Sequence, residues 1–84
     1  MNTVSDYIKA HEFSSNNKKQ LSQDTKCGCF YCLTIFDPKE IKFWISDKHG
    51  TATCPYCGID SVIGESSGFP ITAEFLEKMK AYWF

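Results

Sequence analysis

Two short cysteine runs, Cys29-Phe30-Tyr31-Cys32 and Cys54-Pro55-Tyr56-Cys57, decide the fold of this chain. In each run two residues separate the thiols, which lets the backbone turn so that both sulfurs face one ion at about 2.3 Å. Backbone N–H groups in such a turn, a zinc knuckle, donate hydrogen bonds to the thiolates. The sequence therefore predicts one Zn²⁺ per chain, with the ligands Cys29, Cys32, Cys54 and Cys57.

The four thiolates would close the metal site. They fill a tetrahedral coordination sphere and leave no position for water, so a site of this kind is structural and not catalytic. Pro55 and Gly58 fit the second knuckle, because proline presets one backbone angle and glycine accepts the positive φ that ends the turn. Iron is the alternative metal. Residues 54–58 are similar to the second knuckle of rubredoxins, whereas Leu33 follows Cys32 where the rubredoxin first knuckle has glycine.

A fifth cysteine, Cys27, is not needed for a four-cysteine site. We interpret it as a small side chain next to Gly28 that takes no part in metal binding. Two alternatives stay open: Cys27 could replace Cys29 as a ligand, or it could be a reactive thiolate whose pKa is lowered by a nearby metal cluster. An enzyme or thiol-redox sensor would pair Cys27 with His11 or His49. We expect His11 to pack in the core and His49 to lie in a solvated turn, and we predict no enzymatic activity.

A helix start signal, Asp37-Pro38-Lys39-Glu40, lies between the two cysteine pairs. Aspartate suits the N-cap, proline suits the first helical position, and glutamate completes a capping box. Ile41, Trp44 and Ile45 follow at helical spacing, so one face of the helix would be buried. The sequence predicts a helix over residues 38–46.

Two more helices are predicted near the ends of the sequence. Thr3 is the N-cap of a short helix that reaches His11, with Val4 and Ile8 on the same face as the histidine. Thr72 is the N-cap of a longer helix, whose apolar stripe we expect to pack on the core. That stripe consists of Phe75, Leu76, Met79, Tyr82 and Trp83.

These elements predict an α+β fold in one compact domain. We expect a small zinc-ribbon-like β-sheet with rubredoxin-type knuckles, a helix inserted between the knuckles, a C-terminal helix and a short N-terminal helical segment. The N-terminal segment spans residues 1–26 and the four-cysteine domain spans residues 27–84. Residues 14–20 are polar and only Leu21 anchors them, so we expect a linker or a poorly buried helix there.

Size and charge narrow the function classes. A chain of 84 residues gains little stability from its core alone, so a metal staple is expected. The formal net charge is −1 and the sequence contains no arginine. Because arginine is favoured for bidentate contacts with phosphate and guanine, its absence argues against binding to duplex nucleic acid.

The sequence also predicts the cellular compartment of the protein. No apolar stretch approaches the ~18 residues that a membrane span needs. The first six residues lack the basic start and the apolar core of a secretion signal. We therefore expect a cytoplasmic protein whose thiols stay reduced.

Three runs carry a resemblance to a known family: residues 27–32, residues 54–64, and residues 71–76 together with the final Tyr82-Trp83-Phe84. In order and spacing they resemble a family of short bacterial proteins known only as cytoplasmic proteins. The likeness spans roughly His11 to Phe84. It implies a bacterial cytoplasmic setting and a zinc-binding fold, and it implies no mechanism.

The leading hypothesis is a non-enzymatic zinc-binding protein that binds another protein. Aromatic residues make up 15% of the chain and are favoured anchors at interfaces. We expect four of them to stay partly exposed as an interaction surface: Phe43, Tyr56, Phe69 and Phe84. The alternative is a weak binder of single-stranded nucleic acid that uses lysine and aromatic stacking. The sequence makes no prediction of the oligomeric state.

Overall fold

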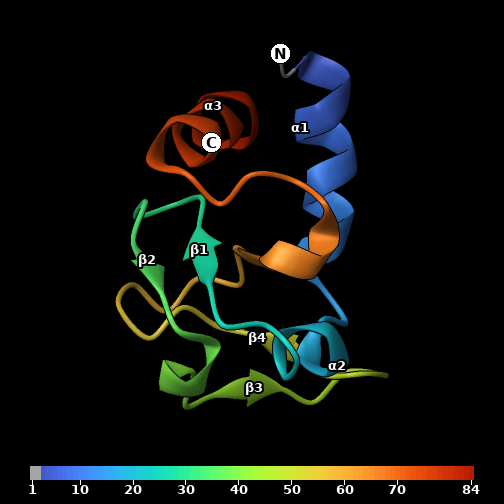
Figure 1. Cartoon of the computed structure of the whole chain (residues 1–84). Coiled ribbons are helices and arrows are strands. Elements are labelled where there is room, and N and C mark those ends of the chain that lie inside the picture. The colour runs from blue at the N-terminus through green and yellow to red at the C-terminus, as the bar shows by residue number, and fades with distance from the viewer. Residues whose placement is uncertain (1–2) are drawn as a thin grey trace.

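The first cysteine pair begins in the central strand of a three-stranded sheet in the computed structural model, which describes residues 3–84. Strand β1 (Cys27–Cys29) lies between β2 (Ile35–Phe36) and β5 (Val62–Gly64), and both pairings are antiparallel. Gly28 pairs with Ile63 and Cys29 pairs with Val62. Figure 1 shows this sheet in the middle of the molecule.

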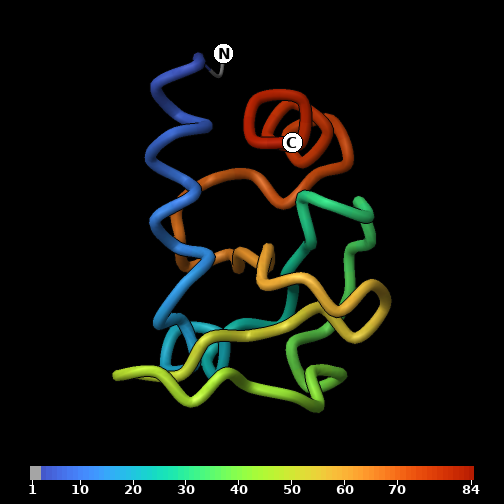
Figure 2. The backbone as a smooth tube through the Cα atoms, turned by 180° about the vertical axis from the view of Figure 1, so that it is seen from behind, coloured from blue at the N-terminus to red at the C-terminus, as the bar shows by residue number. Residues whose placement is uncertain are grey.

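A second, two-stranded sheet lies at one end of the molecule. Strand β3 (Trp44–Ile45) pairs antiparallel with β4 (Thr51–Ala52), and an exposed loop joins them. Figures 1 and 2 place this hairpin opposite the end that carries the helices α1 and α3. In this hairpin Trp44 pairs with Ala52 and Ile45 pairs with Thr51.

Two helices begin where the sequence predicts them. Helix α1 (Val4–His11) has Thr3 as its N-cap, with a capping box to Asp6. Helix α3 (Ala73–Trp83) has Thr72 as its N-cap, whose hydroxyl accepts a hydrogen bond from the Phe75 N–H. The shorter helical elements are α2 (Lys18–Leu21) and the 3₁₀ turns η1 (Glu12–Ser14), η2 (Pro38–Glu40) and η3 (Glu65–Ser67).

The three-stranded sheet separates two apolar cores, because alternate residues of a strand point to opposite faces. The first core contains the cysteines of the knuckles with Leu21, Phe36, Ile41, Ala52 and Val62. The second core lies under α1 and α3 and contains Ala10, Phe30, Ile63, Ile71, Phe75, Leu76 and Met79. Gly28 allows close packing here: a Cβ at this position would lie 2.6 Å from Leu76 Cδ1. The α+β expectation is thus confirmed.

The helix predicted over residues 38–46 is wrong. Asp37 is an N-cap and forms the expected capping box with Glu40, but the helix that follows is a single 3₁₀ turn. Trp44–Ile45 forms strand β3. Aromatic and β-branched residues favour strands, and the pairing of Trp44 with Ala52 outweighs the helical spacing. Only Ile41 of the expected buried face is buried, whereas Ile45 is exposed.

The predicted buried face of the first helix is also wrong. Val4 and Ile8 are exposed, and Ala10 is the buried residue of α1. Tyr7 packs instead, with its ring 5.3 Å from the ring of Phe75. The helix turns Tyr7 and not Ile8 toward the core, because an aromatic ring buries a larger apolar area.

Residues 14–20 lead into the expected poorly buried helix, because α2 begins at Lys18 and both Lys18 and Lys19 are exposed. Leu21, however, does not anchor this segment alone. Asn17 is 1% exposed and Leu21 is 1% exposed. The Asn17 side chain donates to the carbonyl oxygens of Phe13 and Val62, both at 2.9 Å, and accepts from the N–H of Ala52 at 3.1 Å. This segment therefore joins α1 to both sheets.

Candidate metal centre

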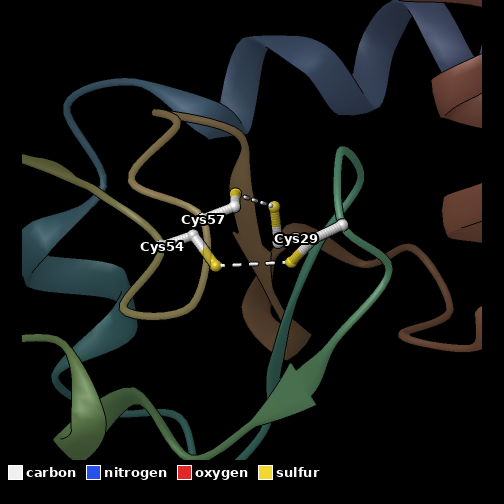
Figure 3. A group of neighbouring side chains, drawn as sticks. Cys29, Cys54 and Cys57 are labelled. Carbon is white, nitrogen blue, oxygen red and sulfur yellow. Dashed lines mark hydrogen bonds between the residues drawn. The ribbon is translucent and has the colours of Figure 1, made fainter.

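Four cysteine sulfurs converge between the two knuckles. The Sγ atoms of Cys29, Cys32, Cys54 and Cys57 all lie within 4.8 Å of one another. The Cys29–Cys57 and Cys32–Cys54 distances are each 3.6 Å. Sulfurs about 2.3 Å from one tetrahedral ion would lie about 3.8 Å apart, so the group can hold a metal ion. Figure 3 shows the sulfurs of Cys29, Cys54 and Cys57 pointing toward a common centre.

The first knuckle (residues 29–34) follows β1 and is closed by three backbone donors. The N–H of Cys29 donates to the Thr34 carbonyl at 3.0 Å, and the N–H of Leu33 donates to the Cys29 carbonyl at 2.9 Å. The N–H of Tyr31 donates to Cys29 Sγ at 3.4 Å. These bonds fix the direction of the first sulfur pair.

The second knuckle (residues 54–59) repeats this pattern bond for bond. The N–H of Cys54 donates to the Ile59 carbonyl at 2.9 Å, and the N–H of Gly58 donates to the Cys54 carbonyl at 2.8 Å. The N–H of Tyr56 donates to Cys54 Sγ at 3.4 Å. Both C-x₂-C runs therefore fold into the same turn.

The residue after each second cysteine has a left-handed backbone. Gly58 has a φ of 80°, as expected for a glycine that ends the turn. Leu33 has a φ of 67° at the equivalent position, which is strained for a residue with a side chain. Leu33 packs against the second core. Its burial therefore offsets a strain that glycine would avoid.

Two hydroxyl groups beside the sulfurs were not singled out from the sequence. Ser61 is 1% exposed, and its Oγ lies 3.0 Å from Cys29 Sγ. Thr34 Oγ1 lies 3.3 Å from Cys32 Sγ. Groups of this kind orient metal ligands and stabilise their charge. The sequence offered only a weak signal, namely that Ser61 directly precedes the apolar pair Val62-Ile63.

Burial and hydrogen bonding shift the thiol pKa values in opposite directions. Desolvation raises the pKa of Cys54 and of Cys57 above the ordinary value. Burial also acts to raise the pKa of Cys32, but hydrogen bonds from the side chain and backbone of Thr34 outweigh it and lower that pKa to about 7. The thiols of the second knuckle therefore resist ionisation until a cation replaces their protons.

Cys27 lies outside the group of four sulfurs. Its side chain is 0% exposed, and its Sγ donates to the Phe36 carbonyl at 3.4 Å. Burial, followed by the charge of Asp37, raises the pKa of Cys27 to about 12. The geometry thus gives this thiol a packing role in the first core.

Neither histidine joins the cysteine group, which is the cluster of potential metal ligands found within residues 3–84. His11 is half-buried, and its ring packs against Trp83 in a tilted arrangement with centroids 4.0 Å apart. His49 is exposed in the loop after β3, where its N–H donates to Asn16 Oδ1.

The four aromatics expected at the surface lie in different surroundings. Phe43, Tyr56 and Phe84 are exposed, whereas Phe69 is half-buried and stacks on Phe75. Tyr56 packs near Phe36 and donates its hydroxyl to Glu40.

Phe84 instead contributes to a group at the end of α3. Its ring lies 4.8 Å from the ring of Tyr31 in the first knuckle. Tyr82 and Trp83 precede Phe84 in the chain, and their own ring centroids lie 5.1 Å apart. We call these four side chains the aromatic cluster: Tyr31, Tyr82, Trp83 and Phe84.

Comparison of the chain with protein-family models, curated proteins and solved structures finds no match. Among residues 3–84, no helix combines the length and the apolar character that crossing a bilayer requires.

Proposed function

We propose that this chain is a non-enzymatic zinc-binding protein whose four-cysteine centre is structural and supports a surface that binds another protein. The observation that carries the proposal is the convergence of four sulfurs, all within 4.8 Å of one another, from two equivalent knuckles. Two pairs of sulfurs, one from each knuckle, are 3.6 Å apart. Closed four-thiolate sites of this geometry are typical of structural zinc. Iron is the competing metal, since thiolates in the same arrangement also bind it.

A structural role follows from where the ligands lie in the chain. Cys29 is the last residue of β1 and Cys32 lies in the turn that follows it, whereas Cys54 and Cys57 belong to the turn before β5. An ion held by all four would join these turns, and its binding free energy would contribute to folding. The apolar side chains around the sulfurs form the first core, so metal binding and core packing would stabilise the same region.

The aromatic cluster is the surface that we propose for the partner. Phe84 is 61% exposed and Tyr31 is 39% exposed, although both rings touch the first knuckle region. Lys80 adds a positive charge, with its Nζ 5.0 Å from the Tyr31 ring centroid. Aromatic side chains held on a rigid base are effective interface anchors. The absence of arginine and the net charge of −1 favour a protein partner over duplex nucleic acid.

A cytoplasmic location is part of the proposal. All five cysteines are free, and a zinc centre needs reduced thiols. A reducing compartment would keep them available for the metal.

Native mass spectrometry with elemental analysis of freshly purified, reduced protein tests the metal. We expect one zinc per chain. Iron would redirect the proposal toward electron transfer, and a chain that binds no metal would refute the structural centre.

Replacement of Tyr31 and Phe84 by alanine tests the surface. We expect unchanged zinc content and unchanged circular dichroism, together with loss of a partner that co-purifies with the unmodified protein. Phe43→Ala is the comparison, because Phe43 is 68% exposed and was expected at the surface but lies outside the aromatic cluster, directly before β3. Figure 1 places β3 at the end of the molecule opposite α3. Equal recovery of the partner with both proteins would count against the aromatic cluster.

A further inference from the structure

Only two of the four clustered cysteines have appreciable exposed surface. Cys29 is 0% exposed and Cys54 is 2% exposed, whereas Cys32 and Cys57 are half-buried. Cys32 and Cys57 are the second cysteines of their knuckles, so they are equivalent in the local turn. Any difference in their reactivity must come from what surrounds them.

The first difference is a hydroxyl group. Thr34 Oγ1 lies 3.3 Å from Cys32 Sγ. Ile59 occupies the position in the second knuckle that Thr34 occupies in the first, and its side chain has no donor. A hydrogen bond to a metal-bound thiolate withdraws charge from the sulfur and stabilises it, so Cys57 is the more nucleophilic of the two.

The second difference is steric cover. In the first knuckle, Phe30 is buried under α3, Leu33 packs in the second core, and Phe84 lies on Tyr31. The second knuckle contributes no residue to the second core: Pro55, Tyr56 and Gly58 are exposed, and Tyr56 contacts Phe36 and Glu40 through its side chain. No atom outside the neighbouring residues lies within 4 Å of the Cβ that Gly58 would carry.

We infer that Cys57 is a modification site for soft carbon electrophiles and the first sulfur to leave the metal. This inference rests on the proposed zinc centre. In the step, the Cys57 thiolate attacks the carbon of an alkyl halide, the C–S bond forms, and the halide leaves with the electron pair of the broken bond. The product is a neutral thioether, which binds zinc weakly, so alkylation at Cys57 opens the second knuckle and releases the ion.

The test treats the zinc-loaded full chain with limiting iodoacetamide. Zinc release is followed with a chromophoric chelator, and the first adduct is located by mass spectrometry of peptides. We expect the first adduct on Cys57, with zinc release at the same rate. Native mass spectrometry beforehand shows whether zinc is bound. A chain without zinc overturns both the proposed centre and this inference, whereas a zinc-loaded chain first modified at Cys32, Cys27 or several sulfurs equally overturns the inference alone.

Reciprocal variants test whether the hydroxyl group of Thr34 causes the difference in reactivity between Cys32 and Cys57. Ile59→Thr places a hydroxyl beside Cys57 and should slow the first alkylation on the order of fivefold, the effect of one hydrogen bond. Thr34→Val removes the hydroxyl beside Cys32 and should bring adducts at Cys32 into competition. Thr25→Val is the control, because the Thr25 hydroxyl bonds Glu65 and no sulfur. Unchanged rates and sites in both knuckle variants would overturn the role given to the hydroxyls.

Discussion

At the scale of single residues, the side chain of Asn17 joins three segments of the chain. Its amide pairs with the backbone of Phe13, Val62 and Ala52 while it is 1% exposed. Asn17→Ala would leave buried backbone groups without partners, and each such group costs about 1–3 kcal/mol. We expect the free energy of unfolding to fall by about 3 kcal/mol, measured by urea denaturation of the metal-loaded protein.

Ser15→Ala is the control for this prediction, because Ser15 is exposed two residues away. An Asn17→Ala protein as stable as the control would contradict the role of the amide. The sequence could not reveal this role, because the partners of Asn17 in β5 and β4 are distant in sequence and depend on the folded arrangement.

The left-handed glycines give a second prediction at this scale. Gly58 and Gly68 have φ values of 80° and 85°, and both would carry a Cβ in open space. Alanine at either position should cost about 1–2 kcal/mol of stability through backbone strain alone. Only Gly58→Ala should also weaken metal binding, because the Gly58 N–H closes the second knuckle. Competition with a chelator measures this, and equal affinities in the two variants would contradict it.

At the scale of elements, the packing of α3 on β1 depends on the absence of a side chain at Gly28. A Cβ there would lie 2.6 Å from Leu76 Cδ1 and 3.2 Å from Ile71 Cγ2. Gly28→Ala should therefore cost about 1–3 kcal/mol. In a Leu76→Ala background the clashing atom is gone, so the same change should cost much less. Thermal unfolding of the unmodified protein, the two single variants and the double variant gives the coupling free energy between positions 28 and 76. Purely additive losses of stability would contradict a direct contact.

Sequence patterns predicted helix starts better than helix lengths. Thr3, Asp37 and Thr72 all cap as expected, because a cap needs only nearby atoms. The predicted length of the helix at residues 38–46 is wrong, because the structure of this segment depends on the pairing of Trp44 with Ala52 across a hairpin. A short apolar run fits both helix and strand periods, and only the distant partner decides between them.

At the scale of the whole molecule, residue spacing identified the group of four cysteines, because each pair sits in one local turn. The contacts that distinguish the two pairs could not be predicted. Ser61 reaches Cys29 only through the pairing of β1 with β5, and α3 covers only the first knuckle. Local chemistry therefore predicts the candidate ligands, whereas the surroundings of each cysteine depend on the tertiary structure.

Metal binding should depend steeply on pH. Burial raises the pKa of Cys54 and Cys57, so in the metal-free chain both thiols keep a proton at pH 7, and hydrogen bonds with Thr34 lower the pKa of Cys32 to about 7 despite its burial. An incoming ion must displace at least these two protons. Each displaced proton changes the apparent affinity about tenfold per pH unit, so affinity should fall about 100-fold or more from pH 7 to pH 6.

The direction in which stability changes with pH follows from the linkage between protonation and folding. A bound metal ion would hold the thiols ionised in the folded state and so place their pKa below the unfolded value; its stabilisation would be present at high pH and lost as pH falls. Calorimetric titration with zinc in buffers of different ionisation enthalpy counts the released protons. Release of fewer than two at pH 7, or an affinity that is flat between pH 6 and 8, would mean that the second-knuckle thiols are already ionised. The centre would then be charged before the metal arrives, and the free energy of folding would have to offset that repulsion without help from the ion.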